Sequence, residues 1–189
     1  MVLTVVLVSV GASFGAGTKF TLLVKDKVKS DRQSTDKDFE NGYVRATDLD
    51  TEICTLTVKV KMRGDPSSDC QLEWAFISEN TTSAESDGER VVFCTGKKKI
   101  SLQNNVERVE TLVADKFVYT TIVSNAGGST DKMYGDVYEG FVVLLTSNGE
   151  ILAMDASSKR YEKDEWIEKV RSFVPAPAKN KKNRNKKNK

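Results

Sequence analysis

Histidine is absent from all 189 residues, and this absence removes several kinds of chemistry at once. The chain lacks the commonest general base, the Ser-His and Cys-His nucleophiles, and the side chain that most often binds transition metals. It also has no glycine-rich phosphate loop, no GxSxG elbow and no Cys-x-x-Cys pair. We therefore expect no enzymatic activity, no cofactor, and no catalytic or metal-binding residues. Asp48, Asp50 and Glu52 lack the spacing of a calcium-binding loop, so a solvated loop is the better interpretation.

Long apolar runs are scarce, and the main one lies at the start of the chain. Residues 1–17, MVLTVVLVSVGASFGAG, combine an apolar stretch with small residues, as a secretory signal peptide does. A basic start is missing, so a first β-strand is the alternative. The run is shorter than the roughly 20 apolar residues of a transmembrane helix. We expect an exported protein of the periplasm, the cell surface or the medium.

Positive charge is concentrated in residues 179–189, KNKKNRNKKNK, although the formal net charge is only +2. The other 22 basic and 27 acidic residues give a body near −5, so we expect no basic folded surface. Residues 175–189 are predicted to form a disordered tail that keeps the protein soluble. Alternatively, the tail contacts an acidic polymer, a membrane surface or nucleic acid through its cations. These cations are Lys179, Lys181, Lys182, Arg184, Lys186, Lys187 and Lys189.

Alternating polarity predicts β-structure through the middle of the chain. In ICTLTVKVKM, residues 53–62, apolar and polar side chains alternate, which is typical of a half-buried antiparallel strand. Similar patterns predict strands near 19–29, 70–76, 90–95, 97–102, 106–114 and 116–124, whereas 31–41 reads as a polar loop. Seven or more short strands separated by turns favour one mainly β domain over residues 18–174, an immunoglobulin-like antiparallel β-sandwich.

The end of this domain has the clearest local signals. Asn148-Gly149 between two apolar runs predicts a tight β-hairpin, because both residues tolerate positive φ. A helix should follow over about 158–173, capped by Ser157 or Ser158. Its apolar face should contain Trp166, Ile167, Val170 and Phe173. We expect this helix to cover one sheet edge or one end of the sandwich.

Three cysteines, Cys54, Cys70 and Cys94, allow one disulfide. A loop centred near residue 82 would place Cys70 opposite Cys94 on neighbouring strands, and an oxidising compartment would let them bond. The alternative is three reduced thiols buried as small apolar groups. Trp74, on the same strand face as Cys70, resembles the core tryptophan of immunoglobulin-type domains.

The segment YEGFVVLLTSNGEILAMDASS, residues 138–158, resembles the C-terminal hairpin and helix of small exported proteins of verrucomicrobial bacteria. One member of that group is a pilus-associated protein with an immunoglobulin-like fold. The resemblance implies a role in the cell envelope or in pilus assembly, with no site residues to transfer. Phe141 stands where the pattern has tryptophan.

Two functions remain open from the sequence. The first is an exported structural or protein-binding module with a protein partner in the cell envelope, in which exposed strand edges also permit a homo-oligomer. The second is a module that binds an acidic ligand through the basic tail. No specific small-molecule ligand is predicted.

Overall fold

The computed structural model describes residues 18–40, 43–64, 70–81, 88–124 and 132–172. Within them the chain forms eight antiparallel strands, a 3₁₀ turn and one α-helix. The elements are β1 (Lys19–Glu40), β2 (Tyr43–Arg63), β3 (Cys70–Thr81), β4 (Glu89–Ile100), β5 (Glu107–Val113), β6 (Phe117–Ser124), β7 (Lys132–Ser147), β8 (Glu150–Ala156), η1 (Lys159–Glu162) and α1 (Asp164–Ser172). The prediction of a mainly β antiparallel sandwich with one C-terminal helix is confirmed.

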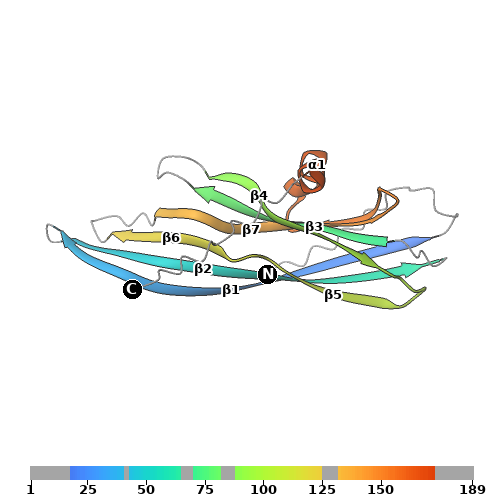
Figure 1. Cartoon of the computed structure of the whole chain (residues 1–189), viewed down its shortest axis with the longest axis horizontal. Coiled ribbons are helices and arrows are strands. Elements are labelled where there is room, and N and C mark those ends of the chain that lie inside the picture. Colours follow the sequence, from blue (N-terminus) through green and yellow to red (C-terminus); the bar gives the residue numbers. More distant parts are fainter. Residues whose placement is uncertain (1–17, 41–42, 65–69, 82–87, 125–131, 173–189) are drawn as a thin grey trace, which may run out of the picture.

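The strands form two layers that face each other (Figure 1). The first layer contains β1, β2 and β5, and the second contains β8, β7, β3 and β4, while α1 lies on the outer side of the second layer. Strand β6 connects the layers, because it pairs with β2 over residues 117–124 and with β7 over residues 119–122. The strand order β1-β2-β6-β7-β3-β4 therefore describes one sheet folded over on itself.

Alternating apolar side chains fill the space between the layers. Leu56, Val58 and Val60 of β2 are fully buried, as are Leu72 and Phe76 of β3. Trp74 packs against this core where Gly96 on β4 leaves room for the indole ring, since a β-carbon at Gly96 would collide with it. The period-two pattern of residues 53–62 thus identified the inward face of β2 correctly.

A second core lies between α1 and the outer side of the second layer. Trp166 and Val170 of α1 pack with Tyr161 against Ala75, Ile77, Val142 and Leu144. Ser158 caps the turn before α1, because its hydroxyl accepts a hydrogen bond from the Arg160 amide. The helix covers a sheet face, so the expectation that it would cover an edge or an end is wrong. In this region β3 and β7 carry apolar side chains on both faces, and α1 buries the face that points away from the first layer.

The hairpin β7–β8 is confirmed, with positive φ at Asn148 (49°) and Gly149 (84°). The predicted loop over 31–41 is wrong, because β1 continues to Glu40 and pairs with β2 along its whole length. Cross-strand pairing explains this: Arg32 donates to Asp50 at 2.7 Å, so a polar segment gains partners as a strand. The predicted segments 1–17 and 175–189 lie outside the described residues.

Side chains close both long sides of the sandwich. On one side, the Val24 amide of β1 donates to the Asp155 carboxylate of β8 at 2.7 Å. On the other, Lys98 of β4 binds Glu110 of β5, which also accepts from Arg108. The Lys98 ammonium and the Arg108 guanidinium hold the pKa of Glu110 below its ordinary value of 4.5, although burial opposes them.

We expect Glu110→Gln to lower the free energy of unfolding by about 1 kcal/mol at neutral pH, since Lys98 and Arg108 are half exposed and water screens the pairs. Because the folded pKa is depressed, this stabilisation is present above pH 4.5 and is lost as the pH falls through the folded pKa. Urea unfolding of both proteins across the acid range should show the difference shrinking on acidification. A difference that stays constant with pH would contradict the assignment.

Candidate binding surfaces

Outward-facing side chains of the first layer form a basic surface, which we call the lysine face. The strand register directs every second residue of β1, β2, β5 and β6 away from the interlayer core. Over residues 19–33, 47–63, 107–113 and 118–122, seven cations and two acids point outward, which leaves a formal charge of +5. They are Lys19, Lys25, Lys27, Lys29, Lys59, Lys61 and Arg63 with Asp31 and Glu107.

The lysine face corrects an expectation from composition. A body charge near −5 argued against a basic folded surface, yet the cations are gathered on one face by strand alternation. Net charge could not reveal this, because acids elsewhere in the body outnumber these cations and cancel them in the sum. No described element covers the lysine face, since α1 lies on the opposite side of the molecule (Figure 1).

Exposed aliphatic side chains run along one side of the lysine face and form an apolar strip. Ile53, Val109, Val113 and Val118 are 41%, 52%, 60% and 44% exposed. Val113 pairs with Thr55 and Val118 with Thr51, the outward neighbours of Ile53 on β2, so three of these side chains lie close together. A contiguous apolar group of this kind usually marks an interaction surface, whereas isolated exposed aliphatics need no explanation.

Most cations of the lysine face are not engaged in ion pairs within the described chain. Lys59 binds Glu107 at 2.9 Å, and it is the one member of the face for which an ion pair is found there. By contrast, cations on the second layer are used internally: Arg90 binds both Glu79 and Glu139. The exposed ammonium groups of the lysine face therefore remain available to an external anion.

The acidic run that resembled a cation site is already occupied by protein groups. Asp50 accepts hydrogen bonds from Arg32 and Thr121. Burial raises the pKa of Asp50, but these hydrogen bonds outweigh it and hold the pKa below its ordinary value. Glu52 accepts from Tyr119 at 3.1 Å. Among the described residues, no group of three or more potential ligands could hold a metal ion. Asp48, Asp50 and Glu52 belong to strand β2, so the prediction that they lie in a solvated loop is wrong.

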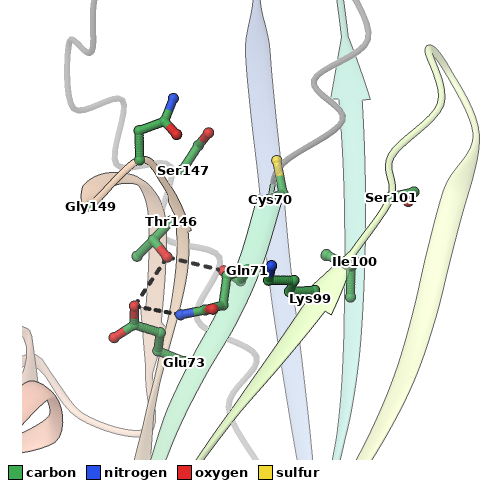
Figure 2. Close-up of a pocket in the computed structure, with 10 residues that line it drawn as sticks. Cys70, Gln71, Glu73, Lys99, Ile100, Ser101, Thr146, Ser147 and Gly149 are labelled. Atoms are coloured by element: carbon green, nitrogen blue, oxygen red, sulfur yellow. Dashed lines mark hydrogen bonds between the residues drawn. The ribbon is translucent and has the colours of Figure 1, made fainter.

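A pocket of about 660 Å³ lies at one end of the second layer, where β3 begins, β4 ends and β7 turns into β8 (Figure 2). Its buried carboxylate, Glu73, accepts hydrogen bonds from Gln71 at 3.0 Å and Thr146 at 3.2 Å. The other carboxylate oxygen has no hydrogen bond but lies 3.3 Å from the Lys97 ammonium and 3.9 Å from Arg171. The charge of Glu73 is thus balanced within the protein, whereas Lys99, which also lines the pocket, has no ion pair among the described residues.

The cysteines do not form the predicted bond. Cys70 lies opposite Ile100, and Cys94 lies opposite Phe76, six residues further along β3. Six strand residues span about 20 Å, far beyond the separation that a disulfide bridges. The Cys70–Cys94 prediction is therefore wrong, because the connection between β3 and β4 is centred several residues later than residue 82. Burial raises the pKa of Cys54 to about 11, which keeps this thiol protonated.

The cations of residues 179–189 lie outside the described residues, so their predicted contact with a polyanion stays a prediction. Among the described residues, no helix has the length and apolarity that a membrane span requires. Sequence reasoning recognised the outward lysines of β2 but did not combine them with those of β1. The signal was present in the alternation of Lys25, Lys27 and Lys29.

No family model and no curated protein matches this chain. The solved structures to which it is similar include a crystal structure from Akkermansia muciniphila, with 10% identity, 87% of this chain and 80% of that chain covered, and a TM-score of 0.29. A Northeast Structural Genomics Consortium target has 13% identity, 66% and 89% coverage, and a TM-score of 0.19. TM-scores this low carry no argument about the fold or the role of this chain.

We predict that native protein resists alkylation at Cys54, which is fully buried and has a raised pKa. After unfolding in urea without reductant, all three cysteines should react. Intact mass before and after unfolding measures both quantities. Two cysteines that stay unmodified in urea would restore the disulfide, and rapid native labelling of Cys54 would contradict its burial.

Proposed function

We propose that this chain is an exported, non-enzymatic binding module of the cell envelope that attaches to acidic material through the lysine face. The observation that carries this proposal is the gathering of seven cations against two acids on one uncovered sheet face. Attraction between such a face and an acidic partner is long-ranged and acts before contact. The apolar strip adds contact area once the partner is close.

The non-enzymatic part of the proposal is supported by how the polar groups are used. Of the four buried carboxylates among the described residues, Asp50, Glu73 and Glu110 are each engaged by a cation and by further hydrogen bonds or ion pairs, and Asp155 accepts the backbone amide of Val24. A catalytic acid or base needs a proton-transfer partner in a cleft, together with a pKa near the working pH. The absence of histidine from the sequence supports the same conclusion.

Export and the envelope location are supported by the sequence of residues 1–17 and by the resemblance of residues 138–158. Both are features of the sequence, and cell fractionation tests them directly. An extracytoplasmic protein shortened by about residues 1–17 is expected. A full-length protein in the cytoplasm would remove this part of the proposal while leaving the lysine face to be explained.

A structural role in a pilus-related assembly is the second candidate, and it includes a homo-oligomer or a protein partner held by strand addition. The observation that favours it is the pairing of β4 with β3 alone and of β5 with β2 alone among the described strands. The other edges of β4 and β5 therefore offer backbone groups to an added strand. A concentration-dependent mass in solution would favour this candidate.

We expect Lys25→Gln/Lys27→Gln to weaken binding to an immobilised polyanion such as heparin and to reduce the slope of log affinity against log salt by about two. The matched control is Lys159→Gln/Lys163→Gln, which removes the same charge next to α1. The control should change the slope much less. Equal effects in both variants would show that net charge, and not the lysine face, controls binding. A loss confined to a variant with the seven cations of residues 179–189 changed to Gln would assign binding to the tail.

A further inference from the structure

We infer that the acidic partner of the lysine face is the surface of an anionic lipid bilayer, on which the first layer lies flat. The inference rests on the proposed function and names its partner. Three properties of the face favour a lipid surface: the kind of cation, the lack of aromatic side chains, and the position of the apolar strip.

The cations are almost all lysines. Six of the seven are lysine, and Arg63 is the exception. Arginine presents a rigid fork that matches one carboxylate or phosphate in a fixed geometry, whereas the lysine ammonium is a hydrated point charge on a flexible stem. Lys25, Lys27 and Lys29 are exposed and lie in one row along β1. Such groups suit mobile head groups, which adjust to the charge pattern, better than a partner with fixed anion positions.

Aromatic side chains are absent from the described outward positions of the lysine face, residues 19–33, 47–63, 107–113 and 118–122. Phe117 and Tyr119 of β6 are both buried and belong to the inner side. Proteins that bind single-stranded nucleic acid stack bases on aromatic rings, and those that read duplexes insert a helix or ribbon into a groove. The lysine face has neither device, so nucleic acid is the poorer fit.

The apolar strip completes the match with a lipid surface. Ile53, Val113 and Val118 are exposed without being needed for the core. At a bilayer surface, aliphatic side chains enter the interfacial region while lysine stems lie along it and their ammonium groups reach the head groups. A second copy of the chain is a poorer partner for this face, because a formal charge of +5 would meet the same charge.

The test is co-sedimentation of the full chain with vesicles of phosphatidylcholine, with and without phosphatidylglycerol. We expect binding only when phosphatidylglycerol is present, and weaker binding as salt is added. Lys25→Gln/Lys27→Gln/Lys29→Gln should lower the affinity about a hundredfold, since each lysine near an anionic surface contributes about fivefold. The control is Lys159→Gln/Lys163→Gln, which removes two positive charges away from the lysine face, against three in the test variant. It should have a much smaller effect.

Ile53→Ser/Val113→Ser separates a lipid surface from a soluble polyanion. Both side chains are exposed, so the fold should tolerate the change, and the charge is unaltered. We expect vesicle affinity to fall about tenfold through lost apolar contact, with heparin retention unchanged. Unchanged vesicle affinity would overturn the insertion of the strip.

The outcomes for the inference and for the proposed function are distinct. Heparin binding through the lysine face without vesicle binding overturns the lipid inference and leaves the proposed function standing. Failure to bind either probe overturns both. Vesicle binding that survives the lysine substitutions but is lost when the seven cations of residues 179–189 become Gln would assign the lipid contact to the tail and overturn the inference.

Discussion

The fold depends on burial of β7 on both of its faces. Val143 and Leu145 enter the core between the layers, while Val142 and Leu144 lie beneath α1, and all four are fully buried. The same strand pairs with β3 along one side and with β6 and then β8 along the other. A polar side chain at any of these four positions would therefore be buried in one of the two cores, at a direct cost in free energy.

The two layers are held differently along their lengths. Near β6 they are joined by backbone hydrogen bonds, since this strand pairs with members of both layers. Farther along, side chains provide the connection: Asp155 accepts the Val24 amide on one side, and Glu110 binds Lys98 on the other. Side-chain contacts are easier to open than a strand ladder, so this part of the sandwich should fluctuate first.

Local patterns in the sequence were enough to predict the strand-rich fold, the β7–β8 hairpin and the C-terminal helix. Asn148-Gly149 and Ser158 each act through neighbouring backbone, which is why they could be read directly. Partners distant in sequence could not be read in this way. Arg32 extends β1 through Asp50, and the position of Cys94 opposite Phe76 depends on a register that the turn chemistry did not define. The lysine face was missed for the same reason, because it combines strands separated in the chain.

The position of α1 makes the two outer sides of the sandwich different. The helix lies on the outer side of the second layer, whereas the lysine face belongs to the first. The two sides do not compete for space, and two sheet layers about 10 Å apart separate them. A partner bound on the helix side would therefore be held at a fixed distance from the surface that the first layer contacts.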